Sequence, residues 1–423
     1  DAAAPDDAAP NAAPDAAPDA APRGPEPLPF PDDFLLGTAT AGFQVEMGCP
    51  TLPPEECEDR HSDWYAFITS PETLGDANTH LNGDPPTFGP GFWETYESDL
   101  DLARDTLHSN GFRMGIEWSR VFPVPTDQAE TLDDLRALAD ADAVAHYHAI
   151  LAAVRARGMT PLVTVNHYTL PDWIHDAVGC HQDLAACDRR GWLDRERTVR
   201  EIAKYAGFLG AEFGDQVDLW ATENEPFALL LPGYLLPSAE RSNPPAVSLH
   251  FDDAKVVLRA LVEGHARMYD ALHAADPTAL VGVVYNLTPA RPADPTDPLD
   301  VQAAANFFYV WNEVYMNGVG AGMLDEDLDG TAEPRPDLAG RLDFVGVNYY
   351  TRVTVDGVAR SALPALSPLL TFNPLNLVLW EDYPRGLYEM IAYVNDTFGV
   401  PAIVTENGTM DPFETRASFL VRH

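Results

Sequence analysis

The sequence predicts an α/β protein with the TIM (β/α)8 barrel fold, lacking the last strand and helix in this chain. Seven short apolar runs are continuous rather than alternating, which is typical of parallel strands that are covered on both faces. Amphipathic segments separate these runs, and a repeated strand-then-helix order over 423 residues favours a barrel. A doubly wound open sheet is the alternative, but no glycine-rich phosphate loop follows the first run.

The expected strands, in chain order, are residues 34–40, 112–118, 161–167, 217–225, 280–286, 344–350 and 402–407. The amphipathic segments between them are expected to be helices and lie at 92–108, 142–157, 197–212, 251–274 and 385–398. In the first of these, one face carries Trp93, Tyr96, Leu100, Ala103 and Leu107. A barrel of this class has eight strands, so the eighth is expected to be missing and two barrel edges to be unpaired.

Two regions of unequal length are expected, a tether and a folded domain. Residues 1–27 repeat Ala, Pro and Asp without an aromatic residue, so they are expected to form a disordered tether. Residues 28–423 are expected to form the barrel domain, incomplete at its C-terminal end. The chain begins at Asp1 rather than Met, so we expect an exported protein that is periplasmic, extracellular or attached to the cell surface by a lipid anchor. A cytoplasmic location is less favoured.

The four cysteines favour the same location. Cys49 and Cys57 lie eight residues apart, and Cys180 and Cys187 lie seven apart. Two local disulfides suit an oxidising compartment, although three pairings can be drawn and cross-pairing stays open. Four free thiols are the main alternative. A metal site is less favoured, since no CxxC motif or nearby pair of histidines supports it.

The charge balance excludes one class of partner. The chain has 66 acidic and 26 basic residues, a formal net charge of −40, so it would repel nucleic acid. The acidity indicates either an ordinary acidic surface or a salt-adapted one. No run of about 18 apolar residues occurs, so no transmembrane segment is expected.

Polar side chains gather where the expected strands end. They are Gln44, Arg113, Glu117, Asn166, His167, Asn224, Glu225, Asn348, Tyr350, Glu406 and Asn407. In barrels of this class the carboxyl ends of the strands carry the chemistry. The sequence therefore predicts an active site at this rim.

Two of these residues are glutamates that end the fourth and seventh strands. Glu225 and Glu406 would face each other across the barrel mouth with carboxyl groups about 5 Å apart, a spacing that predicts double displacement with retained configuration. Two carboxylates that close resist ionising together. Arg113 and Tyr350 are expected to hold Glu406 anionic as the nucleophile, which leaves Glu225 as the general acid and later the general base.

The neighbouring residues have assigned roles and alternatives. Asn224 is expected to bind the sugar 2-hydroxyl, where a hydrogen bond strengthens toward the transition state. A backbone cap is the alternative for Asn224, and a structural ion pair with Glu117 or another acid is the alternative for Arg113. His167 could instead be a hydrogen-bonded core histidine. Glu223 precedes Asn224 by one residue and is expected to point away from the mouth.

Six motifs occur in order: FLLGTATAGFQVE, GFRMGIEWSRVFP, VTVNHYTLPDWI, ATENEP, FVGVNYYTR and IVTENG. From about residue 30 to its end, the chain resembles glycoside hydrolase family 1, the β-glucosidase and β-galactosidase group. The resemblance implies that Glu225 is the acid/base and Glu406 the nucleophile. It also implies substrate-binding roles for Gln44, His167, Asn348 and Tyr350, with no cofactor and no metal. The family continues into an eighth strand that reads the sugar, so the chain is expected to be truncated at its C-terminus.

The function expected from these observations is a retaining exo-β-glycosidase of the β-glucosidase type. Its partner would be a small-molecule or oligosaccharide β-glycoside. One alternative is an inactive or vestigial sugar-binding protein, because the eighth strand is missing. A second alternative is a transglycosylase, in which a sugar acceptor replaces water.

Overall fold

The computed structural model describes residues 30–31, 33–361, 367–373, 376–378, 381–409 and 416–423. The predicted tether at 1–27 lies outside the described residues. The chain divides into Asp1–Leu35 and Leu36–His423. Within the first unit, the rings of Phe30 and Phe34 stack with their centroids 4.2 Å apart.

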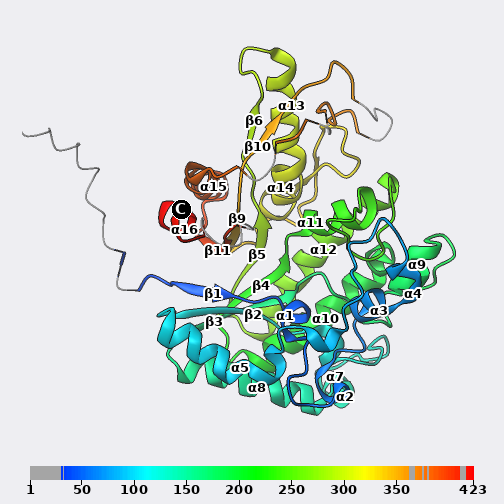
Figure 1. Cartoon of the computed structure of the whole chain (residues 1–423), viewed down its shortest axis with the longest axis vertical. Helices are drawn as coiled ribbons and strands as arrows, with labels where there is room; N and C mark the ends of the chain where they lie inside the picture. Colours follow the sequence, from blue (N-terminus) through cyan, green and yellow to red (C-terminus); the bar gives the residue numbers. More distant parts are fainter. Residues whose placement is uncertain (1–29, 32, 362–366, 374–375, 379–380, 410–415) are drawn as a thin grey trace, which may run out of the picture. The chain divides into compact units, whose positions relative to one another are not determined.

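Seven parallel strands form the main sheet of the second unit, in the order in which they occur along the chain (Figure 1). They are β1 (Gly37–Ala39), β2 (Gly111–Gly115), β3 (Thr160–Asn166), β4 (Leu219–Asn224), β5 (Leu280–Asn286), β9 (Phe344–Tyr349) and β11 (Ala402–Asn407). All seven predicted strands are confirmed, although β1 is shorter than the predicted 34–40. Among the described residues, β1 and β11 are the two unpaired edges of the barrel sheet.

The continuous apolar pattern has the expected cause. Strands β2 and β9 are buried at every residue, because side chains on both of their faces are covered. The edge strand β11 is different: Val404 keeps 41% of its surface exposed.

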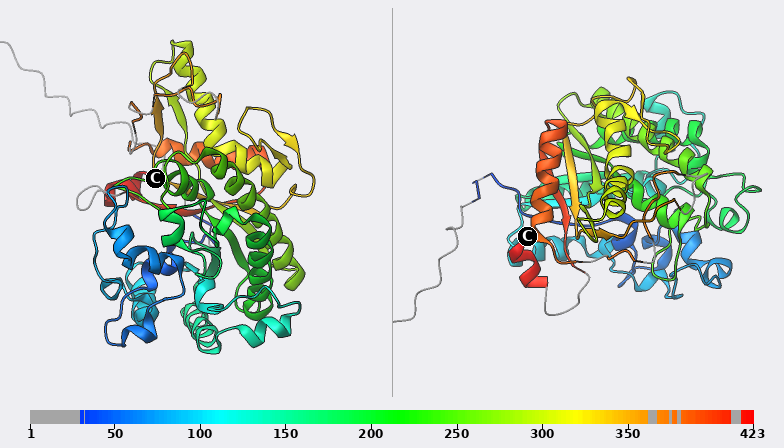
Figure 2. Two further views of the ribbon diagram at one scale, coloured as in Figure 1. Left: turned by 90° about the vertical axis from the view of Figure 1, so that its right-hand side faces the viewer. Right: turned by 90° about the horizontal axis from the view of Figure 1, so that it is seen from above.

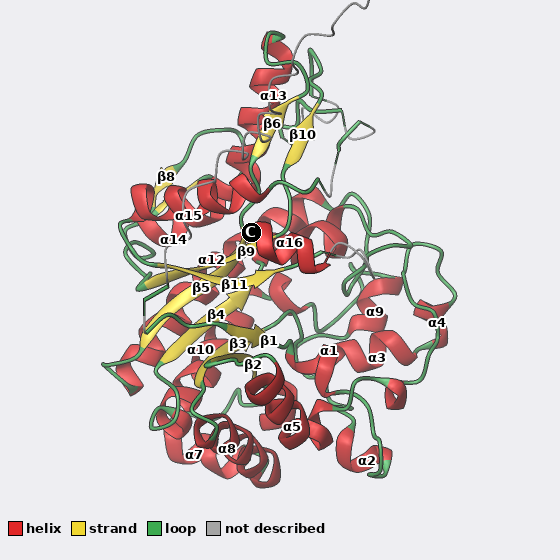
Figure 3. Ribbon diagram, turned by 60° about the vertical axis from the view of Figure 1, so that its left-hand side comes forward, coloured by secondary structure: helices red, strands yellow, loops and turns green. Residues whose placement is uncertain are grey.

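The predicted helices lie outside the strands (Figure 3). They are α5 (Phe92–Asp101), α8 (Ala141–Ala156), α10 (Arg195–Phe213), α12 (Phe251–Ala275) and α15 (Pro384–Phe398). Helix α5 continues as a π-helical turn over Leu102–Thr106. Helices α10 and α12 pack on each other, and α15 packs on β9 and β11 (Figure 2).

The sequence did not predict the long helical segment between β5 and β9. It comprises α13 (Pro298–Phe308), a π-helical turn (Tyr309–Glu313) and α14 (Val314–Ala321). Its start carries ordinary signals, since Asp297 accepts a hydrogen bond from the Leu299 N–H and Pro298 occupies the first turn. The five consecutive apolar or aromatic residues at 307–311 hide its helical periodicity.

Short elements complete the unit. Two small strand pairs join β6 (Ala290–Pro292) to β10 (Val353–Val355) and β7 (Met323–Leu324) to β8 (Glu333–Pro334). The short helices are α1 (Gly42–Glu46), α2 (Pro54–Cys57), α3 (Asp63–Thr69), α4 (Pro71–Leu74), α6 (Trp118–Val121), α7 (Leu132–Leu138), α9 (Ala177–Gln182), α11 (Pro226–Leu230) and α16 (Arg416–Arg422). A π-helical turn at Leu231–Leu235 extends α11.

Both local disulfides are present. Cys49 pairs with Cys57 and Cys180 with Cys187, with Cα atoms 5.8 and 5.0 Å apart. The structure therefore has no free cysteine, and the alternative of four free thiols is wrong. In the described part of the chain, every helix is too short or too polar to span a bilayer.

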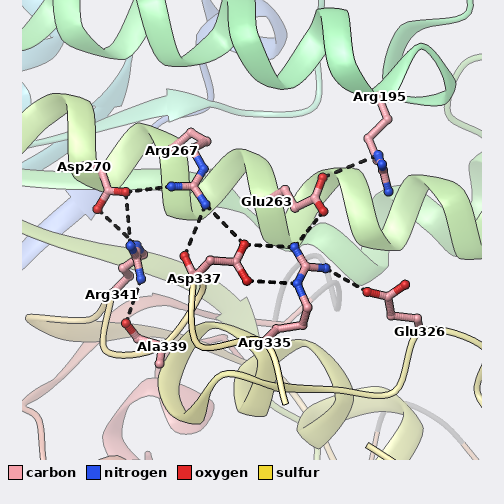
Figure 4. A network of polar contacts seen from close by, with 9 residues as sticks. All are labelled: Arg195, Glu263, Arg267, Asp270, Glu326, Arg335, Asp337, Ala339 and Arg341. Carbon is pink, nitrogen blue, oxygen red and sulfur yellow. Dashed lines mark hydrogen bonds and ion pairs between the residues drawn. The ribbon is translucent and has the colours of Figure 1, made fainter. Parts of the chain in front are cut away.

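A network of ion pairs ties the segment before β9 to helix α12 (Figure 4). Its charged members are Arg195, Arg259, Glu263, Arg267, Asp270, Glu326, Arg335, Asp337 and Arg341. Arg335 contributes the most contacts, at 2.9 Å to Glu263, 2.7 Å to Glu326 and 3.0 Å to Asp337. Arginine therefore bridges acids that would otherwise repel one another in this acidic chain.

Candidate active site

The two predicted glutamates stand at irregular points of their strands. The pairing of β4 with β5 shifts register between Ala221 and Asn224, and the pairing of β11 with β9 shifts between Val404 and Glu406. Such irregularities re-aim side chains beside active sites. Glu225 follows β4 with a left-handed φ of 44°, while its N–H donates to the Val284 carbonyl at 2.8 Å. A non-glycine residue held in this region is strained, and strain of this kind clusters at functional sites.

Glu406 is held by a cation and a phenol. Arg113 Nη1 donates to Glu406 Oε1 at 2.6 Å, and the Tyr350 hydroxyl donates to Oε2. Arg113 comes from β2, is almost fully buried, and also donates through Nε to Thr164 Oγ1 at 3.0 Å. The structure thus places Arg113 and Tyr350 beside Glu406, and Arg113 forms no ion pair with Glu117.

Glu225 is held by neutral groups. Asn348 Nδ2 donates to Glu225 Oε1 at 2.7 Å, and the Tyr168 hydroxyl donates to Oε2 at 3.0 Å. Glu225 is 5% exposed, so water does little to stabilise its charge. Asn348 is itself fixed, because Thr405 Oγ1 donates to its Oδ1 at 2.7 Å.

Asn224 links the two sets of contacts. Its Oδ1 accepts from Arg113 Nη2 at 2.7 Å and from Asn348 Nδ2 at 3.2 Å. Its Nδ2 donates to the Tyr168 hydroxyl at 3.0 Å. Both glutamates are therefore connected through one buried hydrogen-bond network that is centred on this amide.

These different partners drive the two pKa values apart. Burial raises the pKa of Glu225 above its ordinary value, and the negative charge of Glu406 raises it further. Burial also acts to raise the pKa of Glu406, but the charge of Arg113 and the Tyr350 hydrogen bond outweigh it and lower that pKa. The pair is thus arranged to keep one proton, on Glu225, which is the pattern of an acid beside a nucleophile.

His167 and Gln44 differ in their surroundings. His167 directly follows β3, and its buried Nδ1 has no hydrogen-bond partner among the described residues. Burial and the charge of Arg113 lower the pKa of His167 to about 3, so its ring is neutral near neutral pH. Gln44 lies in α1 with an exposed side chain, and the structure does not bring it into the network around Glu225 and Glu406.

Sequence reasoning missed Tyr168. Its hydroxyl contacts both Glu225 and Asn224, and its backbone has a left-handed φ of 76°. The available signal was its place directly after His167, at the end of a predicted strand. Glu223, expected to point away from the mouth, is buried and accepts a 2.7 Å hydrogen bond from the Tyr315 hydroxyl.

One group of acids among the described residues is compact enough to hold a cation. Carboxylate oxygens of Asp325, Asp327 and Asp329 lie within 4.8 Å of one another. The buried member, Asp325, already accepts from the N–H groups of Asp329 and Gly330 at 3.1 and 2.9 Å and from the Tyr309 hydroxyl at 3.1 Å. These contacts stabilise a tight turn, and neither Glu225 nor Glu406 belongs to the group.

Known proteins are similar to this chain in sequence and in fold. The chain is 34% identical over 432 residues to a β-galactosidase of Pyrococcus woesei, which covers 90% of this chain and 82% of that protein. It is 26% identical to β-glucosidase A of Thermotoga maritima, over 90% of this chain and 78% of that protein. The crystal structure of the β-glycosidase from Thermosphaera aggregans superposes with a TM-score of 0.77 at 29% identity, covering 93% and 84% of the two chains.

The family model gives the same result over nearly the whole chain. The model described as glycosyl hydrolase family 1 matches residues 27–418, which include every motif discussed above. This match agrees with the barrel, the paired glutamates and the similar proteins above. The chain belongs to glycosyl hydrolase family 1.

Proposed function

We propose that the protein is a retaining exo-β-glycosidase of the β-glucosidase type, with Glu225 as acid/base and Glu406 as nucleophile. The observation that carries the proposal is the asymmetry of the two glutamates. Glu406 faces a guanidinium and a phenol, whereas Glu225 faces an amide and a phenol. Their carboxyl groups are predicted to lie about 5 Å apart, which leaves no room for water between nucleophile and anomeric carbon.

In the first step, ionised Glu406 attacks the anomeric carbon of the terminal sugar. Protonated Glu225 donates its proton to the departing glycosidic oxygen, so the aglycone leaves as a neutral alcohol. The step forms a glycosyl ester on Glu406 and breaks the glycosidic bond. Because the ester carries no charge, the negative charge that raised the pKa of Glu225 disappears.

In the second step, the now ionised Glu225 takes a proton from the incoming water. Water attacks the anomeric carbon, the ester breaks, and Glu406 returns as a carboxylate. Two inversions give a product with retained configuration. Arg113 and Tyr350 stabilise Glu406 as it becomes charged again.

Neighbouring groups offer contacts to the sugar. Asn224 uses one of its two side-chain N–H bonds on Tyr168, which leaves the other for the 2-hydroxyl. His167 stays a proposed ligand of a second hydroxyl, because it directly follows β3 at the same rim. For Asn348 and Tyr350, contacts with the glutamates support an additional role in holding the carboxyl groups. Gln44 stays a proposed sugar ligand, and its side chain is exposed.

The test uses aryl β-glucosides and β-galactosides, with azide as a small external nucleophile. The full chain is expected to release the aryl alcohol and a sugar whose anomeric configuration is retained. Glu406→Gly should be nearly inert, and azide should rescue it with the α-glycosyl azide, because one displacement inverts the configuration. Glu225→Ala should be rescued with the β-glycosyl azide. Failure of azide to rescue either variant would contradict the assignment.

The same assay separates the two alternatives. Calorimetric binding of sugars without turnover by the full chain would favour a vestigial binding protein. Transfer of the sugar to an added alcohol or saccharide, in preference to water, would favour a transglycosylase. We also propose an exported location, which the two disulfides support.

A further inference from the structure

A buried carboxyl group connects two segments that carry residues of the candidate site. Glu117 follows β2 and is 2% exposed. Its Oε1 accepts the Phe43 N–H at 2.9 Å, and its Oε2 lies 2.5 Å from Thr169 Oγ1. One side chain therefore joins helix α1 to the segment after β3, although 126 residues separate Phe43 from Thr169 in the chain.

Each end of this connection adjoins a residue of the site. Phe43 is followed by Gln44, the proposed sugar ligand in α1. Thr169 is preceded by Tyr168, whose hydroxyl donates to Glu225 at 3.0 Å. The approach to α1 is close, since a Cβ atom on Gly42 would come within 2.0 Å of Glu117 Oε1. Only glycine fits at position 42 while Glu117 holds this position.

The charges around Glu117 explain which form it takes. The ionisable groups near it are Glu46, Asp59, Arg120, Tyr147 and Tyr205. Burial and the charges of Glu46 and Asp59 raise the pKa of Glu117 to about 8. Arg120 is the cation of this group, and its Nε is already paired with Glu46 Oε2 at 2.8 Å. Glu117 therefore keeps a proton at neutral pH.

A neutral carboxyl suits both contacts. Oε1 accepts the Phe43 N–H, and Oε2 accepts from Thr169 Oγ1, a hydroxyl that can also accept a hydrogen bond from a protonated carboxyl group. Glutamine offers the same pair of functions, with Oε1 as acceptor and Nε2 as donor. Alanine offers neither. Two substitutions at position 117 therefore form a matched pair. Glu117→Gln keeps both hydrogen bonds, and Glu117→Ala removes both.

We propose that Glu117 is a positioning residue for the glycosidase reaction: its carboxyl group fixes the Tyr168 segment against helix α1, and so keeps the Tyr168 hydroxyl on Glu225. This inference rests on the proposed function, because it assigns Glu225 as the acid. The Glu117 carboxyl group has its hydrogen bonds with Phe43 and Thr169, and these do not reach Glu225. It acts through Thr169 and Tyr168 on the acid, and through Phe43 on the segment that carries Gln44.

If Glu117 positions Tyr168, replacing Glu117 should change the pKa of Glu225 and not only lower the amount of folded protein. The Tyr168 hydrogen bond lowers the pKa of Glu225, whereas Glu406 and Arg241, the charges acting on Glu225, stay in place in the variants. If the Tyr168 segment shifts, the pKa of Glu225 rises. The alkaline limb of the kcat/KM profile then moves to higher pH.

The experiment compares Glu117→Gln, Glu117→Ala, Thr169→Val and Tyr168→Phe in the full chain on an aryl β-glucoside. Glu117→Ala is expected to lower kcat about tenfold, as the loss of buried hydrogen bonds suggests. It should also move the alkaline limb upward, as should Thr169→Val and Tyr168→Phe. Glu117→Gln should keep kcat within about twofold and leave the limb in place. A Glu117→Ala profile that matches the wild type would overturn the proposal.

A second measurement is independent of turnover. Amide hydrogen exchange should be faster over residues 42–46 and 167–170 in Glu117→Ala, and unchanged there in Glu117→Gln. If the full chain does not hydrolyse glycosides, the proposed function fails, while this comparison still tests the connection. Equal protection in the two variants would refute it. Faster exchange over the whole chain in Glu117→Ala would indicate global destabilisation and would also count against a positioning role.

Discussion

Arg113 donates to Glu406 at 2.6 Å through one guanidinium nitrogen and to Asn224, the residue before Glu225, at 2.7 Å through the other. One buried cation therefore contacts the proposed nucleophile and the residue that precedes the proposed acid. The cation favours the ionised form of Glu406 and contacts Glu225 only through Asn224. This arrangement makes the two glutamates chemically different.

Replacing Arg113 with Met should move the acid limb of the kcat/KM profile to higher pH. Glu406 must be ionised to attack, and loss of the adjacent cation raises its pKa, by about 1–3 units for a close charge. Arg113→Lys is the matched control, since it keeps a positive charge but not the fork that reaches both Glu406 and Asn224. An unchanged acid limb in Arg113→Met would contradict this account of Glu406.

Arg241 offers a milder test on the acid. It is exposed, yet its charge lowers the pKa of Glu225. Arg241→Met should therefore move the alkaline limb upward by roughly a few tenths of a unit, and added salt should shrink the difference, because exposed charges are screened. Arg155→Met on helix α8 is the control and should leave the limb in place. A shift that persists undiminished in high salt would point to a structural change.

Glu117→Gln should change stability in a pH-dependent way. The pKa of Glu117 is raised from 4.5 to about 8 in the folded protein. Between these values the unfolded chain releases a proton that the folded chain keeps, so the wild type loses stability as pH rises. The stability advantage of the variant should grow from pH 4.5 to about 8, by at most about 1.4 kcal/mol per pH unit. Urea unfolding at several pH values measures it, and a constant difference would contradict the raised pKa.

The ion-pair network at α12 should contribute to stability without affecting catalysis. Arg335→Met removes the ion pairs with Glu263, Glu326 and Asp337, and each of these acids keeps one pair with another arginine. We expect a loss of about 1 kcal/mol in unfolding free energy, reduced in high salt, with kcat/KM unchanged. Arg385→Met is the control, because Arg385 is largely exposed and makes one pair on a single helix. Equal Tm values for the two variants would show that the network contributes nothing.

The sequence predicted the barrel well because its strands carry a strong local signal. A strand buried on both faces must be apolar throughout, so the runs at β2 and β9 could be read directly. The α13–α14 segment was missed for the opposite reason, since consecutive aromatic residues hide a helical period. The length of β1 also depended on pairing with β2, which local sequence does not encode.

The contacts within the candidate site were predicted only in part. Glu225, Glu406, Arg113 and Asn348 could be found because they lie in or next to strands whose ends meet at one rim. Tyr168 and Glu117 could not be assigned their contacts in this way. The contact of Tyr168 depends on a left-handed backbone conformation, and that of Glu117 depends on how close α1 lies to the residues that follow β2. Such contacts arise from tertiary packing, which strand periodicity does not report.

The most direct test of the central claim traps the first step. A β-glucoside with fluorine at C2 and a good leaving group should react once with the full chain and then hydrolyse slowly, because fluorine destabilises both transition states. Peptide mass spectrometry is expected to find the added sugar on Glu406. A label on Glu225 or elsewhere, or rapid turnover to a product of inverted configuration, would contradict the assignment of Glu406 as nucleophile.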